Sequence, residues 1–314
     1  MTRASVIAAA WCALFALSAC ASLPVPEAPP AETAGGPVPR QVQVRDRGGA
    51  VAPAVEQRVL AAVKAEGNGD LTEHHLRVLA ASGDVDLYRG NATRLLLDGP
   101  ATFGAMKAAI GRARGRVLLE SYIVEDSKMA DELSALLARK VTQGVAVALM
   151  YDAVGSRSID AAYFGRLAEA GVAVCKFNPV NPLERPGYWG INHRNHRKVL
   201  VVDEEVAFTG GINISRAYSA GSSAVRGSGG NDGDESLQRG WRDTHIELRG
   251  PVVGAFARGF GNVWKSQGCQ GALGSAPVPA NAAPGQRVVK LLESDPRDES
   301  NRIYSALLQA IGAS

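Results

Sequence analysis

The sequence has few aromatic side chains and almost no excess of charge of either sign. Phe, Trp and Tyr make up 6% of the residues, and 34 Lys and Arg stand against 31 Asp and Glu, for a formal net charge of +3. Nucleic-acid-binding domains usually combine a basic surface with aromatic rings that stack on bases. No basic run in this sequence is interleaved with aromatics. The composition therefore gives no support to a nucleic-acid partner, and none is expected.

Cysteine is equally scarce. The four cysteines are Cys12, Cys20, Cys175 and Cys269, and no two have the close spacing of a zinc knuckle or a Cys-x-x-Cys redox pair. Metal binding by thiolates is therefore not expected. Cys175 and Cys269 could pair in an oxidising compartment, but we expect each to be a free, buried thiol.

No apolar run near the N-terminus is long enough to predict a membrane span with confidence. Residues 6–17 are apolar, follow Arg3 and have the length of a signal-peptide core. Leu17-Ser18-Ala19-Cys20 then resembles a bacterial lipobox, in which Cys20 is lipidated and becomes the new N-terminus. The alternative is an ordinary secretory signal cut near an Ala-x-Ala site. In either case residues 1–19 are a signal peptide and the mature domain is exported.

The next segment predicts a tether. Residues 20–54 are rich in Pro, Ala and Gly and have no periodic apolar pattern, so we expect an extended linker after the lipidated Cys20. Lipidation with more than one chain is enough for stable attachment to a membrane. We therefore expect an exported, membrane-anchored lipoprotein that faces the bacterial periplasm.

From residue 55 onward the sequence alternates between helical and strand periodicities. Residues 55–85 predict two N-terminal helices, the first ended by Gly67 and the second opened by Asp70. This alternation predicts crossover connections, and hence an α/β fold with a mixed, mostly parallel sheet flanked by helices on both faces. The strands are expected over 93–97, 117–124, 145–151 and 172–177, and the helices over 101–113, 129–141 and 161–170.

One predicted strand carries reactive side chains. Because side chains alternate along a strand, His196 and Lys198 are expected on the same face. Gly211 lets the backbone approach a bound group, and Asn213 adds an amide donor beside it. An imidazole that attacks phosphorus, with a cation and an amide that hold its oxygens, suits a phosphodiester substrate. The full pattern is His196-Arg197-Lys198, four apolar residues, Asp203, six residues, and Gly210-Gly211-Ile212-Asn213.

A lone His-x-Lys pair would more often belong to an ordinary core strand, but the full spacing is far more specific. Two carboxylates, Glu120 and Asp243, lie at or near predicted strand ends. Either could hold His196 in its attacking tautomer, or form only a structural salt link. His245, two residues after Asp243, is expected to be structural.

With this pattern the sequence resembles the phospholipase D superfamily, whose signature is the His-Lys-Asp motif. The resemblance to the bacterial cardiolipin synthase branch extends over about residues 86–266. It is carried by the motif and by Leu118-Leu119-Glu120-Ser121-Tyr122-Ile123, Gly144-Val145, Tyr151-Asp152-Ala153, Phe177-Asn178-Pro179, Asn192-His193-Arg194-Asn195 and Trp241-Arg242-Asp243-Thr244-His245.

The resemblance implies a mechanism. His196 would attack phosphorus and form a phosphohistidine, Lys198 and Asn213 would hold the non-bridging oxygens beside Gly211, and Asp203 would support the geometry of the motif. Asp243 is the better candidate for the acid that orients the histidine. The substrate would be phosphatidylglycerol-like and the product cardiolipin. Exchange of one phosphodiester for another is close to energy-neutral, so no cofactor or metal is expected.

The resemblance also implies two lobes with one motif each. On this basis residues 86–271 form a first lobe, 272–285 an Ala/Pro-rich linker and 286–314 the start of a truncated second lobe, whose strand, loop and helix echo residues 94–110. The second histidine of the reaction would then come from a missing second lobe or from a homodimer partner. A hydrolytic phospholipase D or nuclease of the same fold remains an alternative, as does a non-catalytic envelope lipoprotein that binds phospholipid headgroups.

Overall fold

The computed structural model describes residues 42–67, 69–81, 85–181, 193–219, 241–275, 283–294 and 302–312. All of them belong to one compact unit, residues 38–314. Cys20 and the predicted signal peptide lie outside the described residues, as do most of the predicted tether and the segments 182–192 and 220–240.

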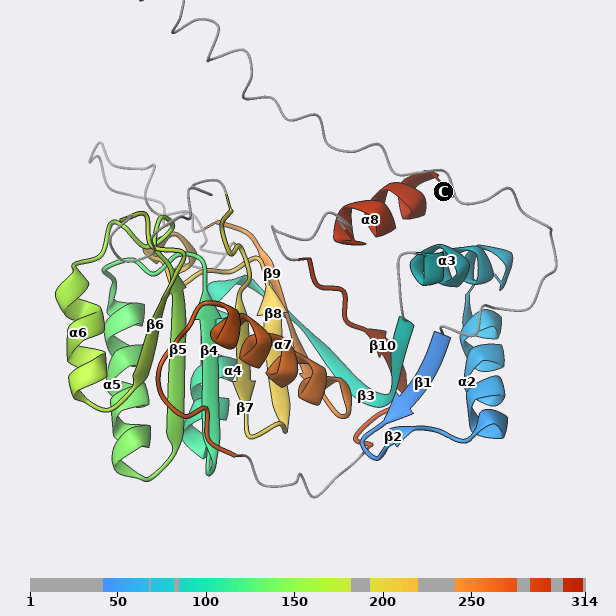
Figure 1. The fold of residues 1–314 in the computed structure, drawn as a ribbon, viewed down its shortest axis with the longest axis horizontal. Coiled ribbons are helices and arrows are strands. Elements are labelled where there is room, and N and C mark those ends of the chain that lie inside the picture. The colour runs from blue at the N-terminus through green and yellow to red at the C-terminus, as the bar shows by residue number, and fades with distance from the viewer. Residues whose placement is uncertain are drawn as a thin grey trace, which may run out of the picture. The chain divides into compact units, whose positions relative to one another are not determined.

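Within the described residues, ten strands form one mixed sheet in the order β2-β1-β3-β9-β8-β7-β4-β5-β6, with β10 also paired to β3 (Figure 1). The strands are β1 (Val42–Asp46), β2 (Gly49–Ala50), β3 (Val85–Leu97), β4 (Arg116–Ser121), β5 (Ala146–Asp152), β6 (Ala173–Phe177), β7 (Val199–Val202), β8 (Val206–Gly210), β9 (Thr244–Arg249) and β10 (Arg287–Lys290).

The mixed α/β sheet predicted from the sequence is confirmed, but parallel pairing is confined to part of it. β4, β5 and β6 are parallel neighbours, as are β1 and β3. The other described pairs are antiparallel, because β7, β8 and β9 follow one another across the sheet without a crossover helix. The motif therefore lies where the parallel half meets an antiparallel meander.

Helices cover both faces of the sheet, as predicted. On one face α4, α5 and α6 enclose a large apolar core with Ile110, Leu137 and Phe208 at its centre. On the other face α7 lies across the strands and buries Phe260 and Trp264 (Figure 1). The helices are α2 (Pro53–Glu66), α3 (Gly69–Ala81), α4 (Asp98–Arg112), α5 (Lys128–Thr142), α6 (Ala161–Glu169), α7 (Val252–Ser266) and α8 (Arg302–Gly312), with a 3-10 turn η1 (Arg216–Tyr218).

Two segments predicted to lie outside the main lobe, one in the tether and one at the start of a second lobe, belong to the sheet. Val42 and Val44, placed by prediction in the tether, lie in β1 and are buried against β3 and the α2–α3 pair, since their alternate spacing puts both on one face. Residues 287–290, predicted to open a second lobe, form β10 and pair antiparallel with β3. The segment extends the same sheet.

The long strand β3 joins these additions to the rest of the fold. Its first part pairs with β1 and β10, and its last part, from Ala92, pairs with β9. At the changeover Asn91 is fully buried and donates from Nδ2 to the carbonyls of Tyr88 (2.6 Å) and Arg287 (3.3 Å). Its Oδ1 accepts from the backbone nitrogen of Val252 at the start of α7 (3.0 Å). One amide thus connects β3, β10 and α7.

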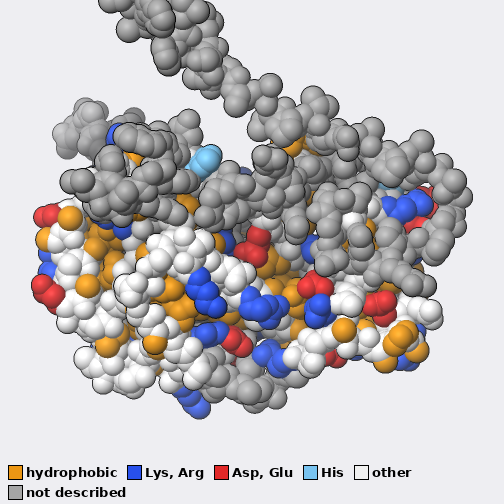
Figure 2. Space-filling model, viewed as in Figure 1, with side chains coloured by type: hydrophobic (Ala, Val, Ile, Leu, Met, Phe, Trp, Pro, Cys, Tyr) orange, Lys and Arg blue, Asp and Glu red, His pale blue; other side chains and the backbone are white. Residues whose placement is uncertain are grey.

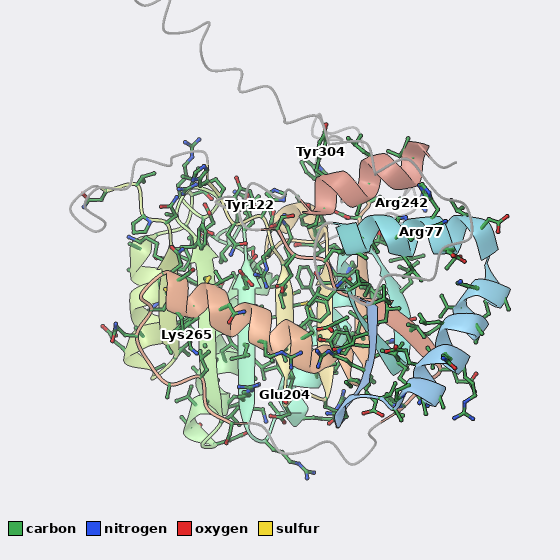
Figure 3. The ribbon with its side chains drawn as sticks, turned by 45° about the vertical axis from the view of Figure 1, so that its right-hand side comes forward. Arg77, Tyr122, Glu204, Arg242, Lys265 and Tyr304 are labelled. Atoms are coloured by element: carbon green, nitrogen blue, oxygen red, sulfur yellow. A yellow bond between two sulfur atoms is a disulfide. The ribbon has the colours of Figure 1, made fainter. Side chains whose placement is uncertain are left out.

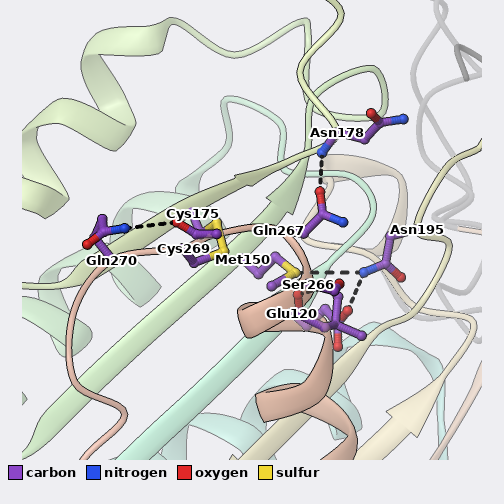
Figure 4. Close-up of a disulfide and its surroundings, with 11 residues drawn as sticks. Glu120, Met150, Cys175, Asn178, Asn195, Ser266, Gln267, Cys269 and Gln270 are labelled. Carbon is purple, nitrogen blue, oxygen red and sulfur yellow. Dashed lines mark hydrogen bonds between the residues drawn. A yellow bond between two sulfur atoms is a disulfide. The ribbon is translucent and has the colours of Figure 1, made fainter. Parts of the chain in front are cut away.

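A disulfide joins Cys175 of β6 to Cys269, just after α7 (Figure 4). Their Cα atoms are 5.6 Å apart across 94 residues of sequence. The expectation of two free thiols is therefore wrong. Its cause is tertiary: α7 crosses the sheet so that its carboxyl end reaches β6, where Gln267 also accepts a hydrogen bond from the Asn178 backbone (3.1 Å).

Two features are absent from the described part of the chain. No helix there is both long and apolar enough to cross a membrane. No cluster of three or more His, Cys, Asp or Glu side chains there is placed to hold a metal ion.

Candidate active site

His196 and Lys198 lie in an extended segment just before β7. The strand itself begins at Val199, which pairs with Glu120 of β4 and with Thr209 of β8. The sequence placed both reactive residues within the strand; the ladder instead starts after them, since pairing with both neighbours ends at Val199. His196 therefore sits at an open end of the sheet and is solvent-exposed, whereas Lys198 is only 6% exposed.

The alternation predicted for the motif holds in this segment. Lys198 Nζ lies 3.2 Å from His196 Nδ1 and donates to the His196 carbonyl oxygen at 2.7 Å. Arg197 turns the other way and forms ion pairs with Glu120 (3.5 Å) and with Glu293 (2.9 Å). The imidazole and the ammonium thus face one site together.

An aromatic ring supports this pair. The Tyr122 ring centroid is 4.3 Å from that of His196, at an interplanar angle of 47°, and Lys198 Nζ lies 5.1 Å from the Tyr122 centroid. Figure 3 shows Tyr122 at the site end of the sheet. The ring limits the orientations of the imidazole and attracts the ammonium through its π face. No role was predicted for Tyr122, because a tyrosine after a strand carries no specific signal.

Burial and mutual repulsion shape the charges of the pair. Partial desolvation of the exposed ring, and next the Lys198 charge, lower the pKa of His196, so that its imidazole is mostly neutral at neutral pH. Burial lowers the pKa of Lys198 to about 8, against the opposing attraction of Asp243. The site therefore holds a neutral imidazole beside a lysine that is mostly protonated at neutral pH.

The glycine pair makes room for β9 as well as for any ligand. A Cβ atom on Gly210 would lie 2.4 Å from the Thr244 carbonyl oxygen and 2.7 Å from His245 Nδ1. A Cβ atom on Gly211 would come within about 2.2 Å of the Asp243 carboxylate. Both glycines are needed because the chain around 243–245 packs directly on them. The structure thus adds a packing reason for the pair, which the sequence explained by ligand approach alone.

His245, expected to be structural, lies in the same site. It is 3% exposed, and its Nδ1 accepts a hydrogen bond from the Ile212 backbone nitrogen at 3.3 Å. The other ring nitrogen therefore carries the proton of the neutral form. Burial lowers the pKa of His245 to about 4, so the ring is neutral at ordinary pH. It fastens the turn after β8 and contributes to the wall beside Lys198.

Asn213 is buried and its amide is largely used by the protein. Its Oδ1 accepts from the Ile123 backbone nitrogen (3.1 Å), and its Nδ2 lies 3.5 Å from the Gly211 carbonyl oxygen. These contacts hold the turn after β8 against the turn after β4, which carries Tyr122. The geometry fits a positioning role better than direct contact with a phosphate.

Asp203 lies at the opposite end of β7 from His196. Its carboxylate accepts hydrogen bonds from the backbone nitrogens of Arg114 (2.6 Å), Gly115 (2.8 Å) and Arg116 (2.7 Å). Figure 3 shows the next residue, Glu204, at the end of the sheet away from Tyr122. The aspartate of the motif therefore fixes the α4–β4 turn and the register of the central strands, at a distance from the reactive pair.

The two carboxylates predicted to orient His196 interact with other groups. Glu120 is buried and accepts a hydrogen bond from Asn195 Nδ2 beside its ion pair with Arg197 (Figure 4). Burial is the main cause that raises the pKa of Glu120, against the attraction of Arg197. Asp243 accepts from its own neighbour, the Thr244 backbone nitrogen, at 2.7 Å.

Asp152, which the sequence did not single out, influences His196 instead. Its carboxylate is fully buried and accepts from the backbone nitrogens of Val154 (2.8 Å), Gly155 (3.0 Å) and Asn195 (3.0 Å). Its negative charge acts to raise the pKa of His196, against the larger effect of burial. The signal for it was its place at the end of β5, level with the motif.

The reactive pair lines a cavity of about 420 Å³. The rest of the wall is largely apolar, and its polar lining residues are His196, Arg197, Lys198, Thr209, Thr244, His245, Glu293 and Ser294. Asp243, Gly211 and Asn213 are not among the described residues that line it. The apolar lining consists of Leu95, Val199, Ile246, Phe256, Leu291, Leu292 and Ile303.

Comparison with known proteins gives consistent matches. The family described as "Cardiolipin synthase, PLD-like domain" matches residues 106–222. The chain is 34% identical to cardiolipin synthase A of Pseudomonas putida, and 35% identical to that of Pseudomonas fluorescens, over 192 residues in each case. These matches cover 60% of this chain and 36% of each relative, so the chain spans little more than a third of their length.

Solved structures also resemble the chain, at much lower identity. NucT from Helicobacter pylori is 14% identical with a TM-score of 0.42, and covers 58% of this chain and 99% of its own. A phospholipase D family member, Nuc from Salmonella typhimurium, is 14% identical with a TM-score of 0.37, and covers 60% of this chain and 98% of its own. By its motif and by its sequence relatives, this chain contains a phospholipase D-like domain of the cardiolipin synthase kind, matched over residues 106–222.

Proposed function

We propose that the protein transfers a phosphatidyl group between alcohols through a phosphohistidine on His196. The observation that carries the proposal is a neutral imidazole 3.2 Å from a buried lysine ammonium, in a cavity lined by both polar and apolar side chains. Such a site suits a substrate with an anionic phosphodiester and an apolar remainder. Phosphatidylglycerol has this chemistry.

In the first step the unprotonated ring nitrogen of His196 attacks phosphorus. A nitrogen–phosphorus bond forms, and the bond from phosphorus to the leaving alcohol oxygen breaks with its electron pair. Lys198, whose ammonium contacts His196 in the free site, binds the non-bridging oxygens as negative charge grows on them. A general acid gives the leaving oxygen a proton.

In the second step an acceptor alcohol loses its proton to the same group and attacks phosphorus. The nitrogen–phosphorus bond breaks and His196 is restored. With phosphatidylglycerol as acceptor the products are cardiolipin and the glycerol released in the first step. One phosphodiester replaces another, so the exchange is close to energy-neutral and needs no nucleotide or other cofactor.

The reaction also needs a general acid, and the described residues around His196 do not supply one. His193 is close in sequence, but its carbonyl oxygen accepts from Asn178 Nδ2 (2.8 Å) and the residue does not line the cavity of the reactive pair. The pKa of His245, at about 4, leaves that residue neutral. We propose that a second lobe or a second copy of this chain provides the acid. Loss of a general acid costs roughly 10²- to 10⁴-fold in rate, so a monomer of these residues alone should turn over poorly.

A hydrolytic phospholipase D or a nuclease would share the first step and use water as acceptor. The apolar cavity wall supports a lipid over a nucleic acid. On the face shown in Figure 2, basic and acidic side chains are interspersed among apolar ones, which also fits poorly with a continuous binding track for a polyanion. A product assay separates transfer from hydrolysis: transfer yields cardiolipin, and hydrolysis yields phosphatidic acid.

We further propose that the protein is exported and anchored to the membrane through Cys20. The lipobox-like sequence supports this, and so does the Cys175–Cys269 disulfide, because such bonds persist in oxidising compartments. Cys20→Ser should release the protein from membranes or leave it unprocessed. Membrane fractionation with mass measurement of the mature N-terminus tests this, and an unmodified N-terminus at another residue would exclude a lipoprotein.

The proposed reaction is tested with His196→Ala against His74→Ala, the same change on the distant helix α3. His196→Ala should abolish turnover of phosphatidylglycerol, as well as any phosphohistidine detected by mass spectrometry. His74→Ala should leave both unchanged. Wild-type turnover by His196→Ala would refute the mechanism.

A further inference from the structure

A second, larger cavity is not lined by the reactive pair. It has a volume of about 830 Å³ and is bounded by α2, α3, the first part of β3 and residues 283–292. Volumes of this order are typical of sites for small organic ligands. Most of its lining is apolar, contributed by Val59, Ala62, Val63, Leu76, Leu79 and Leu87, with further apolar residues from 283–292.

The packing of α2 shows that this apolar surface is only partly used by the fold. The helix has no buried residue, whereas α7, of similar length, buries eight. Val59 and Val63 recur at helical spacing, as a core-facing stripe does, yet both remain half-exposed. Their side chains border the cavity. The stripe of α2 therefore faces space that a ligand can fill.

The charges around this cavity are unequal. Among the described lining residues, Arg89 of β3 and Arg287 and Lys290 of β10 are basic, and Glu66 is the acidic one. The chain as a whole carries a formal charge of only +3, so this local excess is not a reflection of composition. An anionic group is favoured at this rim.

The cavity adjoins the catalytic one. Leu292 lines both, and the neighbouring Leu291 lines the catalytic cavity alone. A molecule with its phosphodiester at His196 and Lys198 would meet Leu292 as it extends along the apolar wall. The two cavities are thus neighbours that share a wall at Leu292.

From these observations we propose that the cavity between α2, α3, β3 and β10 binds an acyl chain of an anionic phospholipid. The choice of ligand rests on the proposed function of the neighbouring site. The supporting features are the apolar stripe of α2 and the shared residue Leu292. A peptide segment would use the apolar stripe but would not require an acyl chain.

The test measures binding in a His196→Ala background, where turnover is not needed. Ala62→Trp would place an indole in the cavity, while Ala61→Trp, on the adjacent exposed position of α2 outside the lining, is the matched control. The probes are dihexanoyl phosphatidylglycerol, below its micellar concentration, and glycerophosphoglycerol, which has the same headgroup without acyl chains. Calorimetry gives each affinity, and thermal unfolding checks that both variants are folded.

We expect Ala62→Trp to weaken binding of the acylated probe at least 10-fold, with Ala61→Trp within 2-fold of the parent. Binding of glycerophosphoglycerol should be the same in all three proteins. Lengthening each chain should raise the affinity of the parent by up to about 4-fold per methylene, and this gain should be lost in Ala62→Trp.

Equal binding of the acylated probe by Ala62→Trp and Ala61→Trp would overturn the proposal, as would a folded parent that binds no acylated lipid. These outcomes are separate from the fate of the proposed reaction, which is decided by turnover and phosphohistidine formation at His196. An acyl site could stand with the reaction refuted, and the reaction could stand with the acyl site refuted.

Discussion

The centre of this sheet and its edge at β1, β3 and β10 are built in different ways. Around β4, β7 and β8 every strand is covered on both faces, and the side chains that line the strands are almost fully buried. Around β1, β3 and β10, the covering helix α2 has no buried residue and several apolar side chains remain exposed, among them Leu71 of α3. Close packing fixes the reactive pair in place, whereas loose packing leaves room for a ligand.

The strongest test of this contrast compares apolar substitutions at the centre of the sheet and at its β1–β3–β10 edge. Phe260→Ala in α7 should lower the free energy of unfolding by about 3–5 kcal/mol, because a fully buried aromatic leaves a cavity. Val59→Ala in α2 should cost less than about 1 kcal/mol, since the side chain is already half-exposed. Urea unfolding measures both. Similar losses of unfolding free energy at the two sites would show that the two regions are equally well packed.

Removing the disulfide is a second way to destabilise the tightly packed region around α7. It closes a loop of 94 residues between β6 and the end of α7, so Cys175→Ser with Cys269→Ser should lower the free energy of unfolding by about 2–4 kcal/mol. The comparison is between oxidised wild type and the double variant in non-reducing buffer. If wild type and the double variant unfold at the same denaturant concentration, the disulfide does not stabilise the fold.

The smallest expected effect is the pH profile of turnover. Activity needs neutral His196 and protonated Lys198. The lowered pKa of His196 moves the acid limb below its ordinary value of 6.5, and the pKa of Lys198 places the alkaline limb at about 8. Above that limb the rate should fall about 10-fold per pH unit as the ammonium is lost. A rate that stays constant to pH 10 would contradict the role of Lys198.

Local patterns predicted the elements whose signals are local. Gly67 ends α2 and α3 begins within one residue of Asp70, as the sequence indicated. The i, i+2 spacing of His196 and Lys198 predicted that they face the same way, and the structure brings their nitrogens within 3.2 Å. β1 was missed although Val42 and Val44 alternate, because Pro- and Gly-rich surroundings masked the pattern.

The rest depends on partners far away in the sequence. The packing demand on Gly210 comes from Thr244 and His245, which reach it only through β8–β9 pairing. Cys175 meets Cys269 because α7 crosses the sheet. No spacing rule within one element can reveal such contacts, since they follow from the order of strands.

The partners of the Asn91 amide also determine how late in synthesis this part of the fold can be completed. Its partners, the Val252 nitrogen and the Arg287 carbonyl oxygen, lie 161 and 196 residues later in the chain. At about 5–20 residues per second, a ribosome needs roughly 10–40 s to make the last of them. Before Val252 is made, the Tyr88 carbonyl oxygen is the one described partner available to this side chain, and until Arg287 is made β3 lacks its neighbour β10. A nascent chain should therefore stay sensitive to proteases until Arg287 has emerged, and then become resistant in one late event.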